Sequence, residues 1–161
     1  MGKKTVLAVV AVSVGLIAAA VVAQTVRIAP SKALQLKQAQ ADIQAGDGAK
    51  AAKDIQGSLN EYNSQDLQRG LFLLGQAKKA QADKTADKAA KDKLYVEAGL
   101  EFMRSAVFFP YTNDAPEAMF SAGECSRLAG DADGAKAAYE TCVVRYGDSA
   151  AGKRAKAALG S

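Results

Sequence analysis

The chain has 161 residues, of which 49% are hydrophobic and only 6% aromatic, and it contains neither tryptophan nor histidine. Without histidine it lacks the commonest general base and the commonest metal ligand, so we expect neither an enzyme nor a bound metal or cofactor. The net charge is +4, and Lys3 and Lys4 supply two of these charges. No basic stripe is interleaved with aromatic residues, which excludes the usual pattern of a nucleic-acid-binding domain.

The N-terminal segment is predicted to direct the chain to a membrane rather than to form part of its fold. Lys3 and Lys4 precede an apolar run over residues 6–23. This run is longer than a usual signal-peptide core and close to the ~20 residues of a membrane-spanning helix, yet it ends in small residues that suit cleavage. We therefore expect either an inner-membrane anchor through residues 5–23 or a signal peptide cleaved near Ala23; a buried core helix is a less favoured alternative. Because the two lysines stay in the cytoplasm, the rest of the chain lies in the periplasm or its equivalent.

A helical pattern of apolar residues follows a short linker and continues almost to the C-terminus. Ser31 is a good N-cap for the first helix, Gly46 a good stop for it, and Asp47 a cap for the second. The turn "NEYNS" precedes a long helix over about residues 65–82. Further helices run from Leu94 to Pro110 and begin near Asn113 or Asp114, Asp131 or Asp133, and Asp148 or Ser149. The predicted division of the chain is a targeting segment (residues 1–23), a linker (24–30) and an all-α domain of about seven helices (31–161).

The stretch over residues 76–93, "QAKKAQADKTADKAAKDK", is rich in charge and has no bulky apolar residue. Charge runs of this kind are usually solvated, so we interpret it as a helical overhang or helix junction. A basic patch that binds a partner is the alternative.

One phrase occurs twice: "AGDGAKAA" at residues 45–52 returns as "AGDADGAKAA" at residues 129–138. Helix–turn–helix units that recur at a fixed period indicate a solenoid of stacked hairpins. In the later copy, Gly123 precedes the turn, and Ala135 and Tyr139 follow it. This pattern resembles the tetratricopeptide repeat (TPR), whose period is about 34 residues. The likeness is strongest in the last third of the chain, which is similar to TPR proteins of the bacterial envelope, including the cell-division-coordinator and outer-membrane-assembly families.

The resemblance implies three repeats and a cap, at residues 32–65, 67–110, 116–149 and 150–159. The first match is weaker, because Gln35 replaces a bulky residue and Ile55 an aromatic one, and its register stays open. The middle repeat needs an insertion of about eleven residues, which is the charged stretch described above.

TPR proteins bind partner peptides or proteins in a concave face lined by the first helix of each repeat. Carried over to this chain, that face implies a partner-binding set of Arg69, Phe72, Gln76, Lys79, Glu117, Phe120, Glu124 and Arg127. Phe72 and Phe120 occupy equivalent places and suit a peptide anchor, since aromatic residues often dominate binding energy. The alternative is that both phenylalanines belong to the core.

The two cysteines are predicted to be separate buried thiols. If Gly123 packs beside Ala135, Cys142 lies level with Pro116, nine residues from Cys125 and so roughly 13 Å away at 1.5 Å per residue. Disulfide-linked Cα atoms lie within about 7 Å of each other. The paired aspartates, which are Asp131 with Asp133 and Asp83 with Asp87, are interpreted as helix caps and solvated charges rather than metal ligands.

We therefore expect a non-catalytic adaptor or scaffold of the cell envelope, attached to the membrane through its N-terminal segment and binding another envelope protein or peptide. The alternative is an accessory subunit packed permanently within a membrane or periplasmic enzyme complex. Exposed phenylalanines at Phe72 and Phe120 would favour the adaptor. Buried ones, with the apolar surface elsewhere, would favour the subunit. The oligomeric state stays open.

Overall fold

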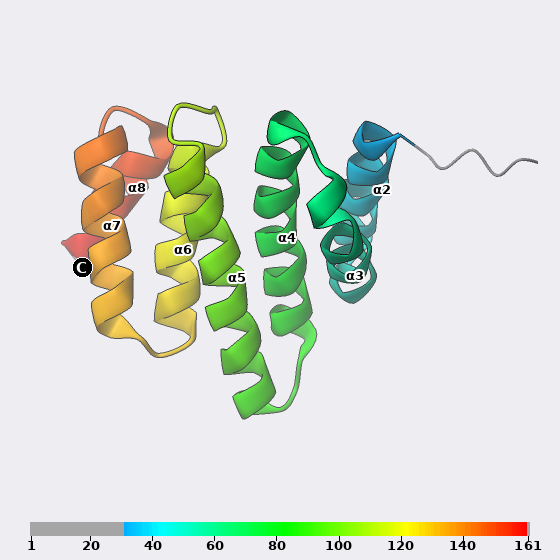
Figure 1. Ribbon diagram of the computed structural model, residues 1–161. Helices are drawn as coiled ribbons and strands as arrows, with labels where there is room; N and C mark the ends of the chain where they lie inside the picture. Colours follow the sequence, from blue (N-terminus) through cyan, green and yellow to red (C-terminus); the bar gives the residue numbers. More distant parts are fainter. Residues whose placement is uncertain (1–30, 161) are drawn as a thin grey trace, which may run out of the picture. The chain divides into compact units, whose positions relative to one another are not determined.

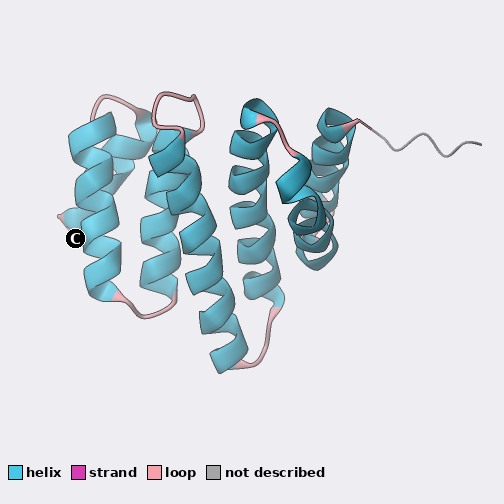
Figure 2. Cartoon of the chain, viewed as in Figure 1, coloured by secondary structure: helices cyan, strands magenta, loops and turns pink. Residues whose placement is uncertain are grey.

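The computed structural model describes residues 31–160, which form seven α helices and one short 3-10 helix, with no strand in this part (Figures 1 and 2). The predicted targeting segment and linker lie outside the described residues. In chain order the elements are α2 (Lys32–Gln44), α3 (Gly48–Ser58), η1 (Leu59–Glu61), α4 (Ser64–Lys84), α5 (Lys88–Phe108), α6 (Ala115–Leu128), α7 (Ala132–Tyr146) and α8 (Ala150–Leu159). None of the seven α helices is long and apolar enough to cross a bilayer.

The helix starts confirm most of the predicted caps. The side chains of Ser31, Asp47, Asp131 and Ser149 each accept a hydrogen bond from the backbone N–H three residues later, which satisfies a donor that the helix leaves open. Asp114 precedes α6 without making such a bond, because its carboxylate is used elsewhere.

The repeated phrase "AGD" corresponds to the same turn in both places. Gly46 and Gly130 have φ angles of 82° and 84°, a left-handed conformation that glycine adopts without a steric penalty. Each glycine follows the end of one helix and leads into the aspartate that caps the next. The turn therefore requires both residue types, which explains why the phrase recurs.

The helices pack mostly against their neighbours in the sequence, as three antiparallel hairpins followed by a final helix (Figure 1). The hairpins are α2 with α3, α4 with α5, and α6 with α7. Contacts between α2 and α4, α3 and α4, α5 and α6, and α7 and α8 join one hairpin to the next, and α6 also touches α8. The first helices and the second helices of the hairpins therefore belong to two different sides of the stack.

Two hairpins share a close contact between a glycine and a ring. A Cβ atom added to Gly123 would lie 2.5 Å from Cε1 of Tyr139, and one added to Gly75 would lie 2.7 Å from Cδ1 of Phe102. The predicted need for a small residue at Gly123 is confirmed. In the first hairpin the equivalent residues, Ala39 and Ile55, are both buried in one cluster.

The middle hairpin is longer than the other two. Gly75 and Phe102 are 27 positions apart in the sequence, whereas the equivalent pairs, Ala39 with Ile55 and Gly123 with Tyr139, are 16 apart. The difference, 27 − 16 = 11, matches the predicted insertion. Accordingly, α4 and α5 have 21 residues each. Residues 76–93 contain the junction between α4 and α5, as predicted, but the stretch is not solvated throughout, because Ala77, Lys78 and Ala82 are buried.

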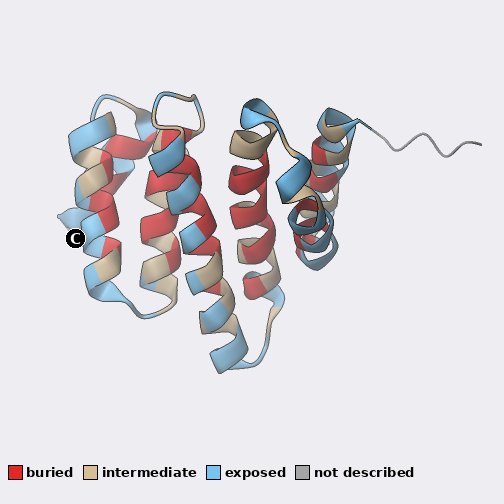
Figure 3. Cartoon of the chain, in the orientation of Figure 1, coloured by how far each residue is buried: buried red, intermediate tan, exposed pale blue. Residues whose placement is uncertain are grey.

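The core consists of two clusters of buried residues (Figure 3). One joins α2, α3 and α4 around Ile55, Leu73 and Leu74. The other runs from α4 to α8 and contains the rings of Phe72, Phe102 and Tyr139. Most of the remaining positions are alanine, so the helices approach closely and few large side chains are needed to fill the interior.

Candidate functional site

The eight residues predicted to bind a partner lie on α4 and α6, the first helices of two successive hairpins. They occupy equivalent positions at an offset of 48 residues: Arg69, Phe72, Gln76 and Lys79 on α4 correspond to Glu117, Phe120, Glu124 and Arg127 on α6. The set differs in exposure. Phe72 is buried, Arg127 is exposed, and the other six are half-buried.

Phe72 belongs to the core rather than to an open binding surface. Its side chain is only 5% exposed, and its ring meets that of Phe102 edge-on, with the centroids 5.7 Å apart. Phe120 is more accessible but also engaged, since its ring lies 5.6 Å from that of Tyr139. The guanidinium of Arg154 on α8 stands 4.2 Å above it, in a cation–π contact. A partner that used Phe120 as an anchor would have to displace this arginine.

The polar residues near the start of α4 tie three helices together. Arg69 donates to the carboxylate of Asp114 over 3.1 Å and to the amide oxygen of Gln40 over 3.0 Å. Gln68 donates to the same carboxylate over 3.1 Å. Two donors from α4 thus converge on the aspartate at the start of α6, which accounts for its missing cap bond.

A second polar group lies toward the other end of α4 and α6. Arg127 binds Glu124 through two hydrogen bonds, of 3.2 and 2.9 Å, and the Tyr139 hydroxyl donates to the same carboxylate. The hydrogen bonds from Arg127 and Tyr139 outweigh partial burial and lower the pKa of Glu124. Burial and the bond to Glu124 raise the pKa of Tyr139 to about 12. The carboxylate is therefore ionised at neutral pH and the phenol is not.

Lys79 stands close to this group and binds another acid. Its ammonium lies 3.0 Å from Asp83, which also accepts a hydrogen bond of 2.7 Å from the Tyr95 hydroxyl. Burial alone would raise the pKa of Asp83, but these two hydrogen bonds outweigh it and lower the pKa. The charges on this side of the molecule are thus satisfied within the chain, which is the arrangement of a structural surface rather than of an acid–base pair.

The cysteines are as predicted. Both are free and buried, and the Cys142 thiol lies 3.6 Å from the backbone carbonyl of Pro116, the residue with which it was expected to be level. Burial raises the pKa of the Cys125 thiol to about 12, so it is not a nucleophile at neutral pH. Among residues 31–160 no three acidic, cysteine or histidine side chains stand close enough together to hold a metal ion.

An apolar surface that was not predicted from the sequence lies on α5, the second helix of the middle hairpin. Val96, Leu100, Met103 and Val107, which we call the α5 stripe, recur at helical spacing and are 40–52% exposed. The stripe forms one wall of a groove of about 380 Å³. The other wall comes from small residues of α7 and the floor from α6, including Gly134, Ala137, Ala138, Thr141, Met119 and Ala122.

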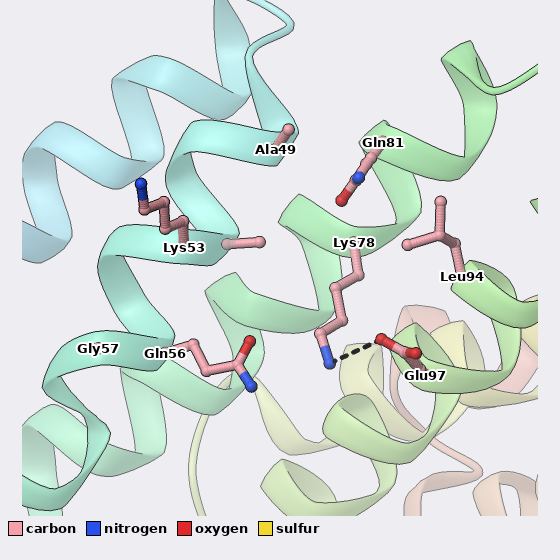
Figure 4. Close-up of a pocket in the computed structure, with 9 residues that line it drawn as sticks. Ala49, Lys53, Gln56, Gly57, Lys78, Gln81, Leu94 and Glu97 are labelled. Atoms are coloured by element: carbon pink, nitrogen blue, oxygen red, sulfur yellow. Dashed lines mark ion pairs between the residues drawn. The ribbon is translucent and has the colours of Figure 1, made fainter. Parts of the chain in front are cut away.

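The equivalent groove between α3 and α5 is more polar (Figure 4). Lys53 and Gln56 line it from α3 and Gln81 from α4. Lys78 on its α4 floor and Glu97 on its α5 wall form an ion pair, in which the ammonium lies 3.3 Å from the carboxylate. Two grooves built on the same plan therefore differ in chemistry, and the fold alone does not require an apolar one.

Comparison with known proteins identifies no relative: no family model, no curated protein and no solved structure matches the chain. The assignment of a function therefore depends on the surfaces described above.

Proposed function

We propose that this chain is a non-catalytic structural subunit of the cell envelope, built from stacked TPR-like hairpins, which packs permanently against another protein chain through the α5 stripe. The supporting observation is that the apolar surface lies on α5 while Phe72 is buried and Phe120 is covered by Arg154. This is the arrangement expected of a packed subunit rather than of a peptide receptor.

The three second helices provide an internal control for this proposal. Aligned on their buried residues Ile55, Phe102 and Tyr139, they place the same four positions at the surface. At these positions α3 and η1 carry Ala49, Lys53, Gln56 and Asn60, α7 carries Asp133, Ala137, Glu140 and Val144, and α5 carries Val96, Leu100, Met103 and Val107. Only α5 is apolar at all four. Because contiguous exposed apolar surface is uncommon on soluble monomers, this difference favours a surface that another chain covers.

A matched pair of variants tests the proposal. Leu100→Glu places a charge in the α5 stripe, and Leu34→Glu places the same charge at a similarly exposed leucine on α2, with exposed fractions of 52% and 55%. The full chain is cross-linked in intact cells that produce it, and its solubilised complexes are separated on native gels. We expect the wild type and Leu34→Glu to migrate as a complex and Leu100→Glu to migrate as the free chain. A complex that is unchanged by Leu100→Glu would contradict the proposal.

The second candidate is the adaptor that binds a peptide on the face of α4 and α6. It is favoured by the exposed side chain of Arg127 on α6 and by the half-buried Gln76 on α4, the position equivalent to Glu124. Arg127→Ala should then weaken capture of a partner, whereas Arg145→Ala, an exposed arginine on α7, should not. Retention of every partner by Arg127→Ala together with Gln76→Ala would exclude this candidate.

A further inference from the structure

We propose that the chain which covers the α5 stripe is a second copy of this protein, related by a twofold axis so that the two α5 helices pack antiparallel. This inference rests on the proposed function, since it names the partner at the same surface. It is carried by the spacing of the stripe, by the charges that flank it and by the area that it exposes.

The stripe has the spacing of a helix that pairs with another helix. Val96, Leu100, Met103 and Val107 follow one another at intervals of four, three and four residues, which is the alternation of the two core positions in a coiled coil. The inner face of α5 has its own buried residues, including Ala98, Phe102 and Ala106. One helix thus carries two apolar faces, of which the hairpin stack covers only one.

The charges beside the stripe are complementary in an antiparallel pair. With Leu100 against Met103 of the second copy, Val96 meets Val107, and Glu97 of each copy comes near Arg104 of the other, two residues from the position directly opposite. These two side chains are accessible, with 38% and 55% of their side-chain surface exposed. They flank the core on one edge, where coiled coils place the ion pairs that set partner and orientation. The twofold axis produces this pair twice.

The shape of the surface fits the same arrangement. Beside the stripe lies the groove toward α7, whose far wall consists of small residues such as Gly134 and Ala137. A ridge of larger side chains next to a shallow groove is self-complementary, as an isologous interface requires. The small residues of that wall leave the stripe accessible to the α5 of a second copy.

The exposed area is of the size that a stable dimer buries. Besides the stripe, Phe108 at the end of α5 and Val144 on α7 are 66% and 84% exposed. Scaled by ordinary residue areas of roughly 150–250 Å², these six residues expose on the order of 700 Å². A standard protein interface buries about 800 Å² per partner, so full burial of these six residues would supply most of that area.

The test uses two versions of the full chain that carry different affinity tags and are produced in the same cells. The measured quantity is how much of one tagged copy co-purifies with the other from membranes solubilised in mild detergent. Glu97→Arg and Arg104→Glu each bring like charges together in a dimer of that variant. Each should reduce co-purification about tenfold or more. When copies of Glu97→Arg are produced together with copies of Arg104→Glu, every pair across the interface is again of opposite sign, and co-purification should return.

The controls separate an interface effect from a folding effect. Thermal unfolding of each variant checks that the swapped charges leave the hairpin intact, because Glu97 also binds Lys78 and Arg104 also binds Glu101. Leu34→Glu should pair like the wild type and Leu100→Glu should not. Restoration in the mixture is the decisive result, since two misfolded variants would not rescue each other.

The outcomes distinguish this inference from the proposed function. The inference is overturned if wild-type copies do not co-purify, if the charge variants pair like the wild type, or if the mixture fails to restore pairing. If copies do not pair while Leu100→Glu still dissolves a complex in native envelopes, the proposed subunit role stands and its partner is a different protein. If neither pairing nor that complex is observed, both are wrong.

Discussion

The close approach of helices at Gly75 and Gly123 can be tested by adding a single methyl group. In each Gly→Ala variant the new Cβ would stand within 2.7 Å of an aromatic ring carbon, closer than real Cβ contacts allow. Neither ring can move away easily, because Phe102 is 1% exposed and the Tyr139 hydroxyl is held by Glu124. Gly57→Ala, in the last turn of α3, is the matched control, since nothing beyond its chain neighbours and the backbone of its own helix lies within 4 Å of the added Cβ.

Two opposing effects set the magnitude. Overpacking a tight core costs about 1–3 kcal/mol, whereas replacing glycine by alanine inside a helix contributes up to about 1 kcal/mol of stability. We therefore expect Gly75→Ala and Gly123→Ala to lower the free energy of unfolding by about 0–2 kcal/mol, the overpacking cost less the helix gain, and to be about 1–3 kcal/mol less stable than Gly57→Ala. Gly57→Ala should leave it unchanged or raise it by up to about 1 kcal/mol.

Urea unfolding followed by circular dichroism measures all three free energies. A second arm repeats Gly123→Ala in a Tyr139→Ala background, where the ring is gone and the methyl group has room. In that background the substitution should become neutral or stabilising. The packing account fails if Gly75→Ala and Gly123→Ala are as stable as Gly57→Ala, or if the loss at Gly123 persists without the ring.

Three further predictions follow from buried and paired groups. The raised pKa of the Cys125 thiol contributes stability that is complete below pH 9 and is lost toward pH 12. The buried thiol should react with a thiol reagent at pH 8 only after denaturant is added. Fast reaction of the native protein would contradict its burial. The lowered pKa of Glu124 contributes stability that is complete above the ordinary pKa of 4.5 and is lost as the pH falls through the lower pKa of the folded protein. In the Glu124→Gln variant, the free energy of unfolding should therefore fall less steeply at acidic pH. An unchanged fall would refute this prediction. Lys78→Met leaves the buried Glu101 carboxylate with only Arg104 and should lower the free energy of unfolding by about 3 kcal/mol, the low end of the cost of breaking a buried ion pair, because Arg104 remains. Adding Glu101→Gln should recover part of this loss. No loss in urea unfolding would mean that the pair contributes nothing.

The parts of the fold that depend on local signals could be predicted from the sequence. The caps at Ser31, Asp47 and Asp131, and the turn glycines at Gly46 and Gly130, act within a few residues, so their roles follow from residue type and position. The place of Gly123 could be predicted because a repeat fixes which residues of its two helices meet.

The role of the predicted site could not be read from the sequence in the same way. Equivalence in the repeat pattern correctly grouped Phe72 with Phe120, but burial depends on which neighbours reach them. Phe72 meets the ring of Phe102 from its own hairpin. Phe120 meets the ring of Tyr139 from its own hairpin and is in addition capped by Arg154 from α8.

The α5 stripe was missed because α5 is apolar on two faces. Its inner residues, from Ala98 to Ala106, satisfied the helical pattern, and nothing in one helix says which face its neighbours cover. A signal was available in the comparison of the three second helices, since the positions of Leu100 and Met103 are Lys53 and Gln56 in the first hairpin. An interaction surface is indicated where exposed positions of one hairpin carry apolar residues and the equivalent positions of another hairpin carry polar ones.

The two candidate binding surfaces, the α5 stripe and the face of α4 and α6, lie on different sides of the helix stack. The α5 stripe belongs to the side formed by the second helices, while Glu124 and Arg127 lie on α6, the first helix of the third hairpin. Pairing through α5 would therefore leave the face of α4 and α6 open on both copies. A second copy on α5 does not compete with a peptide on that face, and two such faces on one dimer would bind a bivalent partner more tightly than a single chain could, by raising its effective concentration. The packed subunit and the adaptor are then roles of different surfaces, and Leu100→Glu and Arg127→Ala separate them.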